Sequence, residues 1–304
     1  MSTNSCCSPN DIQPEQLHVA IIGSGSGAFA SAIKAAEGGA RVTIIEGADV
    51  IGGCCVNVGC VPSKILIRAA QLAHQQRTNP FDGLENIQPQ LSRSLLAHQQ
   101  TARVEELRGA KYQSILENNP ALSLLKGYAR FKNENTLLVQ MADGSEEELV
   151  ADRILIATGS TPSIPPIDGL VDTPYWTSTE ALFSDVLPSS LVVIGSSVIA
   201  LEIAQAYARL GSSVTVLARH TLLYAEDPLL GEKLTECFEK EGIRVLNNTQ
   251  ANHVSYSNNG FSLETNEGTL TAEKLLISTG RHANTDKLGL ENVGVETDKS
   301  GAIV

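Results

Sequence analysis

The chain has 304 residues, of which 42% are hydrophobic, and this is enough apolar material for about two domains. Its formal net charge of −12 argues against nucleic-acid binding through a basic surface. Phosphate ligands are compatible with this charge, because helix N-termini and backbone N–H groups bind them without basic side chains.

The sequence carries no recognisable targeting segment. Residues 1–10 are polar and lack the apolar stretch of a signal peptide, and the hydrophobic runs are broken by glycines or by Glu202. We therefore expect a cytoplasmic protein without a membrane span.

Six cysteines stand at positions 6, 7, 54, 55, 60 and 237. Their adjacent doublets are unlike the disulfide framework of a secreted scaffold. In a reducing compartment, clustered cysteines indicate catalysis or metal handling. A zinc site is disfavoured, because no second pair supplies four ligands at a suitable spacing.

The predicted elements begin with a strand–helix–strand unit. An apolar strand over 17–22 leads through a glycine-rich turn into a helix of small residues that ends near Gly38, and a second strand over 42–45 ends at Glu46. Two long helices (62–78 and 91–117), an antiparallel meander around 121–149 and a strand over 154–157 that ends in Thr158-Gly159 follow. Prolines 162, 165, 166 and 174 then mark a rigid linker.

The second half repeats the first. Its predicted elements are strands over 191–194, 214–217 and 275–278, helices over 198–210 and 226–241, and a meander around 250–271. Strand–helix–strand units of this kind build a parallel sheet. The repeat predicts an α/β fold with two Rossmann-like, parallel-sheet nucleotide-binding domains, each a three-layer ββα arrangement with an antiparallel meander.

The turn Gly23-Ser24-Gly25-Ser26-Gly27-Ala28 fits the G-x-G-x-x-G/A dinucleotide-binding fingerprint. Gly23 permits the tight turn, Gly25 lets a pyrophosphate approach the backbone, and Ala28 allows close helix packing. Glu46 stands at the end of the second strand, where a carboxylate can bind a ribose hydroxyl pair. A glycine-rich turn without a ligand is the alternative, and it does not account for this acid.

The second turn, Gly195-Ser196-Ser197-Val198-Ile199-Ala200, lacks the second and third glycines of the fingerprint. Ala218 replaces the acid at the end of the next strand, and Arg219 follows it. This favours NADP over NAD, because an arginine suits a 2′-phosphate. A solvated surface arginine is the alternative interpretation of Arg219.

Cys55 and Cys60 are five positions apart, and in a regular helix such residues point about 140° away from each other. A disulfide between them needs a distorted backbone, which Gly59 and Pro62 supply. Two inert buried thiols are the alternative. The flanking glycines and Lys64 argue against it.

The run Gly52-Gly53-Cys54-Cys55-Val56-Asn57-Val58-Gly59-Cys60-Val61-Pro62-Ser63-Lys64 resembles the redox-active signature of the pyridine nucleotide–disulfide oxidoreductases. The resemblance covers nearly the whole chain, from about residue 17 to residue 304. Within that family, residues 55–64, the stretch 174–182 and the Gly195-Ser196-Ser197 turn are similar to the mercuric reductases. The resemblance implies a flexible tail (1–14), a FAD-binding domain (15–165), an NAD(P)-binding domain (166–283) and the start of a return to the FAD domain (284–304).

The resemblance also implies a reaction in which NADPH reduces FAD, the Cys55–Cys60 disulfide is reduced, and two electrons convert Hg(II) to elemental mercury. Cys60 would face the flavin as a thiolate, Cys55 would exchange with the substrate, both would bind Hg(II), and Lys64 would pair with Glu202 near the flavin. The implied FAD contacts are Gly23, Gly25, Ala28, Glu46, Gly53, Cys54, Lys64, Ala129, Thr158 and Gly159. The implied NADP contacts are Gly195, Ser197, Val198, Glu202, Arg219 and Gly280.

The sequence departs from the family at several positions. Cys54 replaces the usual threonine and adds a third thiol that can perturb the disulfide or scramble with it. Ala225 stands where a second basic residue for the 2′-phosphate is expected, and Val198 where glutathione reductases carry a gating tyrosine. The Cys6-Cys7 pair suits a soft metal, although a flexible tail is its ordinary interpretation.

The resemblance further implies that the family's second flavin-binding strand and its interface domain lie beyond Val304. We expect a fragment of a longer, homodimeric protein, which alone binds flavin weakly and does not reduce mercury. Two alternatives stay open. One is another disulfide oxidoreductase of the family, resembling glutathione reductase or dihydrolipoamide dehydrogenase, and the other is a non-catalytic thiol module that sequesters metal.

Overall fold

Two parallel four-stranded sheets organise the computed structural model, which describes residues 16–304. The predicted tail over 1–14 and the Cys6-Cys7 pair lie outside the described residues. The first sheet has the order β3-β2-β1-β7 and consists of β1 (His18–Ile22), β2 (Arg41–Glu46), β3 (Leu122–Lys126) and β7 (Arg153–Ile156).

The sequence assigned the residues of β3 to the antiparallel meander, and this was wrong. β3 pairs in parallel with β2, in the register Val42↔Leu122. Its apolar side chains pack on both faces of the sheet, with Leu122 and Leu124 on one side and Leu125 on the other. Burial on both faces is typical of a strand in a parallel sheet.

Each face of the first sheet is covered by a different layer. Ala20, Ile22 and Ile45 pack on the antiparallel sheet, whereas Ile21 and Ile44 pack toward the helices, because successive side chains of a strand point to opposite faces. The antiparallel sheet consists of β4 (Tyr128–Asn133), β5 (Thr136–Gln140) and β6 (Glu146–Val150), and α1 (Ser26–Glu37) leads the helical layer. These three layers are the predicted ββα arrangement.

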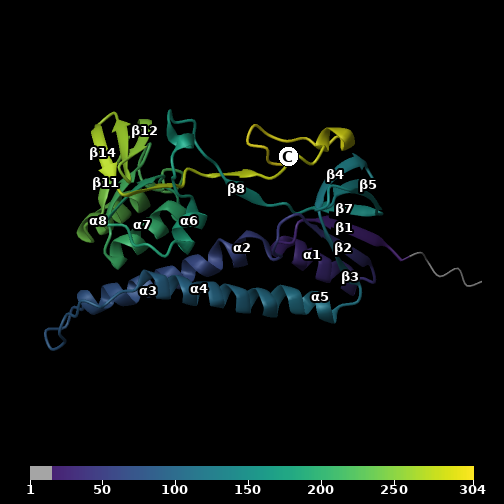
Figure 1. The fold of residues 1–304 in the computed structure, drawn as a ribbon, viewed down its shortest axis with the longest axis horizontal. Helices are drawn as coiled ribbons and strands as arrows, with labels where there is room; N and C mark the ends of the chain where they lie inside the picture. Colours follow the sequence, from purple (N-terminus) through teal and green to yellow (C-terminus); the bar gives the residue numbers. More distant parts are fainter. Residues whose placement is uncertain (1–15) are drawn as a thin grey trace, which may run out of the picture.

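Two long helices, α3 (Cys60–Arg77) and α4 (Arg93–Arg108), run beside both units (Figure 1). The predicted helix over 91–117 is interrupted, since α4 continues through a π-helical turn (Gly109–Gln113) into α5 (Ser114–Asn118). α3 starts beside the first sheet and contributes Leu66 and Ala70 to the core of the second unit. It therefore links the segment that carries Cys55 and Cys60 to both units.

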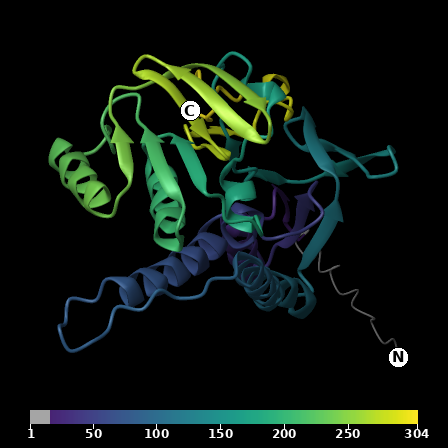
Figure 2. The ribbon, with the colours of Figure 1, turned by 60° about the vertical axis from the view of Figure 1, so that its left-hand side comes forward.

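The second unit repeats the same layers. Its parallel sheet, in the order β11-β10-β9-β15, consists of β9 (Ser190–Ile194), β10 (Ser213–Leu217), β11 (Arg244–Leu246) and β15 (Lys274–Ile277). Its helices are α6 (Ser178–Phe183), α7 (Val198–Leu210) and α8 (Pro228–Lys240). The antiparallel sheet of β12 (Ala251–Ser257), β13 (Gly260–Thr265) and β14 (Gly268–Ala272) covers the opposite face (Figure 2). The helix predicted over 198–210 has the same bounds as α7 in the structure.

The two units are joined by a pair of short antiparallel strands, β8 (Ser160–Pro162) and β16 (Arg281–Ala283). After β16 the chain returns to β4 (Figure 1), where Phe131 donates its backbone N–H to the Leu288 carbonyl oxygen at 2.7 Å. A short 3-10 turn (Leu290–Val293) packs there, and another (Leu170–Asp172) lies in the linker. No helix within residues 16–304 is both long and apolar enough to cross a bilayer.

Candidate redox site and nucleotide-binding turns

The first glycine-rich turn lies against the end of β7 and against the loop that carries the cysteines. Gly23 has a φ of +105°, and a Cβ atom there would stand 2.4 Å from the Ala157 carbonyl oxygen, so glycine is required. Gly53 approaches the turn so closely that its Cβ would stand 2.5 Å from the Cα of Gly25. The structure thus brings together the turn, the cysteine loop and the strand end that leads into Thr158-Gly159.

The N-terminus of α1 is open to an anion. Gly25 precedes the helix, no side chain caps it, and its first turn contains no acidic residue. The first N–H groups of a helix have no intrahelical partner and lie at the positive end of its dipole. Ala28 is fully buried and holds α1 close to the sheet. A pyrophosphate fits this turn, so the residues present suit FAD.

Glu46 is held in place by the same turn. Its Oε2 atom accepts hydrogen bonds from the Ser24 N–H, at 3.1 Å, and from the Ser24 hydroxyl, and its Oε1 atom accepts one from the Ala48 N–H at 2.7 Å. A carboxylate has about four lone-pair sites, so capacity for a ribose hydroxyl is left. Gly127 donates its N–H to the Glu46 carbonyl oxygen at 3.0 Å. This hydrogen bond holds the start of β4, which contains the buried Ala129, beyond the end of β2.

Cys55 and Cys60 stand on two different helices. The short helix α2 (Gly53–Asn57) ends before Gly59. Gly59 has a φ of −128° and a ψ of −109°, which are not helical, so the helix is interrupted there and α3 begins at Cys60. The distorted backbone expected between the two cysteines is confirmed at Gly59, but the part of this prediction that assigned distortion to Pro62 was wrong. Pro62 lies in the first turn of α3, where an N–H group would have no intrahelical partner, so this proline costs the helix no hydrogen bond.

The two thiols interact across this break. A hydrogen bond with the Cys60 side chain raises the pKa of the Cys55 thiol, and burial and the charge of Cys60 act in the same direction. Cys55 is half-buried, whereas Cys60 is exposed, and both are free thiols. Two thiols in this contact can bind one soft metal ion together or oxidise to a disulfide.

An ion pair lies one turn along α3 from Cys60. Lys64 Nζ is 2.5 Å from Glu202 Oε1, which projects from the first turns of α7. Residues four apart share a face of a helix, so Lys64 and Cys60 lie on the same face of α3. The structure therefore joins α3, which begins at Cys60, to α7 through Lys64 and Glu202, and Cys55 lies on α2, which directly precedes α3.

The second nucleotide-binding turn also requires its first glycine. Gly195 has a φ of +142°, and a Cβ atom there would stand 2.1 Å from the Ser278 carbonyl oxygen. Ser197 precedes α7 without capping it through its side chain, and Val198 is exposed at the start of the helix. Gly280 has a φ of +135° just after β15, at the same edge of the sheet.

Arg219 is exposed directly after β10, beside an aromatic pair that the sequence analysis missed. The rings of His220 and Tyr224 lie 4.8 Å apart between centroids. Leu223 between them has a φ of +49°, which turns the chain so that the two rings meet. Glycine or asparagine is the usual sequence signal of a positive φ, and leucine at position 223 gives no such signal.

Arg281, immediately after Gly280, is a second residue that the sequence analysis missed. Its guanidinium donates to the Cys54 sulfur at 3.6 Å and, through Nε, to the Ser160 hydroxyl at 2.9 Å. Cys54 and Arg281 are 227 positions apart, and no local pattern indicates their contact.

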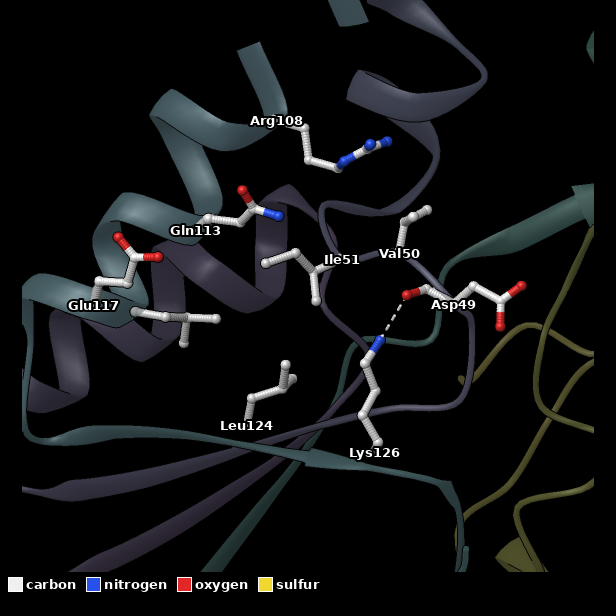
Figure 3. Close-up of a pocket in the computed structure, with 9 residues that line it drawn as sticks. Asp49, Val50, Ile51, Arg108, Gln113, Glu117, Leu124 and Lys126 are labelled. Atoms are coloured by element: carbon white, nitrogen blue, oxygen red, sulfur yellow. Dashed lines mark hydrogen bonds between the residues drawn. The ribbon is translucent and has the colours of Figure 1, made fainter. Parts of the chain in front are cut away.

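Two hollows lie near these residues. Figure 3 shows a pocket between the loop after β2 and the helices α4 and α5, in which Lys126 Nζ donates to the Asp49 carbonyl oxygen at 3.0 Å. Arg108 lines it and also donates to the Asn57 side chain at 3.0 Å, which steadies α2. None of the predicted site residues lines this pocket. A groove between α3 and α4 includes Lys64.

In the part of the chain from 16 to 304, no three His, Cys, Asp or Glu side chains are arranged to hold a metal ion.

Residues 17–304 match the family model described as pyridine nucleotide-disulphide oxidoreductase. The chain belongs to this family. It is 73% identical over its whole length to a mercuric reductase from Shewanella putrefaciens, of which it spans 55%. It is also 57% identical, over 95% of its length, to a mercuric reductase from Shigella flexneri, of which it spans 52%. The chain thus spans about half the length of the curated relatives it matches, and the resemblance to mercuric reductases is confirmed.

The fold of this family member is also similar to that of a solved flavoprotein. The HOCl-induced flavoprotein disulfide reductase RclA from Escherichia coli, in a Cu(II) complex, superposes with a TM-score of 0.84 at 28% sequence identity. The match covers 96% of this chain and 62% of that one. The predicted α/β fold is confirmed.

Proposed function

We propose that this chain contributes the flavin- and NADPH-binding units and the redox cysteine pair of an enzyme that reduces Hg(II) to elemental mercury. The observation that carries the proposal is the placement of Cys55 on α2 and of Cys60 at the start of α3, with the Lys64–Glu202 ion pair one turn further along α3. The similarity to mercuric reductases, at up to 73% identity among the relatives described above, supports Hg(II) as the substrate.

The proposal assigns FAD to the first unit, residues 15–165 with 284–304, and NADPH to the second, residues 166–283. The glycine cradle around Gly23, Gly25 and Gly53 supports the first assignment, because added Cβ atoms would fill it. Glu46 would hold a ribose, Ala129 and Thr158-Gly159 would close the site, and Arg219 would meet the 2′-phosphate of NADPH. FAD, when bound, supplies a two-electron relay between a nicotinamide and a disulfide.

The cysteine pair has the chemistry that Hg(II) requires. Thiolate sulfur is a soft ligand, and Hg(II) is a soft ion, so Cys55 and Cys60 would hold it together. The pKa of the Cys55 thiol is raised, so this thiol keeps its proton to higher pH. Cys55 is also half-buried, and it is therefore less accessible to solvent than the exposed Cys60. NADPH would lose a hydride, and the two electrons that it carries would convert Hg(II) to elemental mercury. The expected homodimer and cytoplasmic location stay predictions.

A single-turnover experiment tests this function. The FAD-loaded enzyme to which this chain contributes is reduced by two electrons without oxygen and is then mixed with Hg(II) or, separately, with glutathione disulfide. We expect Hg(II) to reoxidise the protein and to leave as mercury vapour, and we expect Cys55→Ser and Cys60→Ser each to abolish this. Reoxidation by glutathione disulfide but not by Hg(II) would contradict the substrate and favour another reaction of the family.

A further inference from the structure

The proposed reaction uses two thiols, and the structure places a third one beside them. Cys54 is exposed, and its sulfur lies 3.1 Å from the position that a Cβ atom would take on Gly59. Gly59 directly precedes Cys60, so the Cys54 side chain lies against the residue next to Cys60. After the larger effects of Cys60 and burial, the charge of Cys54 also raises the pKa of Cys55. Cys54 and Cys60 therefore both lie near Cys55.

Arg281 approaches the Cys54 sulfur from the strand pair that joins the two units. Its Nη2 atom donates to this sulfur at 3.6 Å, and its Nε and Nη2 atoms also bond to the hydroxyl and the carbonyl oxygen of Ser160. These bonds to Ser160 fix the guanidinium in place. A fixed cation beside a sulfur stabilises the negative charge that the sulfur carries during thiol–disulfide exchange.

Geometry selects the partner with which Cys54 can react. Neighbouring Cα atoms are about 3.8 Å apart across a trans peptide, which is shorter than the roughly 4.4–6.8 Å that a disulfide spans. A bond between Cys54 and Cys55 is therefore strained. Cys60 follows the glycine that Cys54 contacts, and its exposed sulfur is accessible.

We propose that Cys54 is a second exchange thiol, which forms a disulfide with Cys60 in place of Cys55. This inference rests on the proposed function, in which Cys55 and Cys60 form the redox disulfide. The Cys54 thiolate attacks the Cys60 sulfur, the Cys54–Cys60 bond forms as the Cys55–Cys60 bond breaks, and Cys55 leaves as a thiolate. No electrons are gained or lost, and the proton that Cys54 released to solvent is available to Cys55.

This exchange gives the oxidised protein two forms. In one, the half-buried Cys55 is bonded and the exposed Cys54 is free to meet soft metal ions or thiols from solution. In the other, Cys55 is released from Cys60. A chain with threonine at position 54 has only the first form.

The test uses the full chain in a background where Cys6, Cys7 and Cys237 are replaced by serine, which leaves three of its six cysteines. Cys55→Ala is introduced, and the protein is incubated with glutathione disulfide, which takes up two electrons and becomes two thiols. Free thiols are then alkylated in denaturant. Trypsin releases residues 42–64 as one peptide that carries all three positions, because no Lys or Arg lies between them. Fragmentation of this peptide locates any disulfide.

We expect the Cys55→Ala chain to form a Cys54–Cys60 disulfide, and we expect complete loss of that bond in the matched Cys54→Ser/Cys55→Ala chain. If the background chain forms Cys55–Cys60 but the Cys55→Ala chain keeps both thiols free, the inference about Cys54 is wrong and the proposed function stands. If the background chain forms no Cys55–Cys60 disulfide, the proposed function itself fails. Circular dichroism of each variant verifies that it is folded.

Discussion

Lys64 Nζ lies 2.5 Å from Glu202 Oε1, and this contact joins the helix that begins at Cys60 to the helix that follows the second nucleotide-binding turn. The two side chains are 59% and 34% exposed, so water screens the pair and its contribution to stability is at most about 1 kcal/mol. Its effect is therefore on position, because it ties the first turns of α7 to the helix that begins at Cys60.

We accordingly expect Lys64→Met to slow reoxidation by Hg(II) of the reduced, FAD-loaded enzyme to which this chain contributes at least tenfold, while leaving stability almost unchanged. The matched control is Lys34→Met, which removes an exposed ion pair with Glu37 on α1, far from the cysteines in sequence. Stopped-flow rates and urea unfolding measure the two effects. A Lys64→Met chain with an unaltered rate, or one destabilised by more than about 2 kcal/mol, would show that the pair is not a positioning contact.

A second prediction concerns the pH dependence of Cys55. Its pKa is raised chiefly by the hydrogen bond with Cys60, and the thiolate is the form that reacts with iodoacetamide. The midpoint of the alkylation rate of Cys55 against pH should therefore lie above the ordinary thiol value, and Cys60→Ala should move it downward. The rate is followed by mass spectrometry of the 42–64 peptide. A midpoint that stays in place in Cys60→Ala would contradict the thiol contact.

Much of the fold could be predicted from the sequence, because its signals are local. Buried parallel strands are short apolar runs, as in β9, and the glycine of each nucleotide-binding turn is demanded by a carbonyl oxygen that a Cβ atom would hit. The helix α7 agrees with its predicted bounds because Ser197 and Gly211 mark its two ends.

Other features could not be predicted, because they depend on distant partners or on small backbone deviations. β3 has the composition of a meander strand, and only its pairing with β2 makes it part of the parallel sheet. The π-helical turn that begins at Gly109 is a small deviation within a continuous helical segment. The only sign of it in the sequence is one glycine, which weakens a helix but does not specify a π-helical turn. The Arg281–Cys54 contact joins segments of the two units that the sequence gives no reason to pair.

Arg219 should decide between the two nicotinamide cofactors. A charge-assisted contact with the 2′-phosphate contributes about 1.5–3 kcal/mol, so Arg219→Ala should weaken NADPH binding roughly tenfold or more and leave NADH binding nearly unchanged. Isothermal titration with each cofactor measures this difference, and Arg244→Ala on β11 is a control for loss of charge alone. Equal weakening of both cofactors would remove Arg219 as the discriminating residue.

Reduction of the FAD-loaded chain should produce a long-wavelength absorption band, because Cys60 is proposed to face the flavin as a thiolate. Cys60→Ala should abolish this band, whereas Cys55→Ala should retain it, since the thiolate beside the flavin is still present. Anaerobic titration in a spectrophotometer gives the result directly. A band that survives in Cys60→Ala would reverse the proposed roles of the two cysteines.

The first glycine-rich turn supplies the last prediction, because two of its glycines differ only in their surroundings. Gly23 has a φ of +105° and no space for a Cβ atom, whereas a Cβ atom on Gly27 would meet nothing within 4 Å. Gly23→Ala should therefore lower the free energy of unfolding by roughly 1–3 kcal/mol and reduce the flavin retained per chain. Gly27→Ala should be neutral or stabilising by up to about 1 kcal/mol, because alanine favours a helix.

Urea unfolding and the flavin-to-protein absorbance ratio measure both variants under the same conditions. If Gly23→Ala lowers stability but the refolded chain retains flavin at the level of Gly27→Ala, the turn supports the fold without forming the pyrophosphate site. Equal flavin loss in both variants would instead mean that the cofactor needs space at Gly27 as well. The expected result, loss at Gly23 alone, follows because the Ala157 carbonyl oxygen blocks any side chain at that position only.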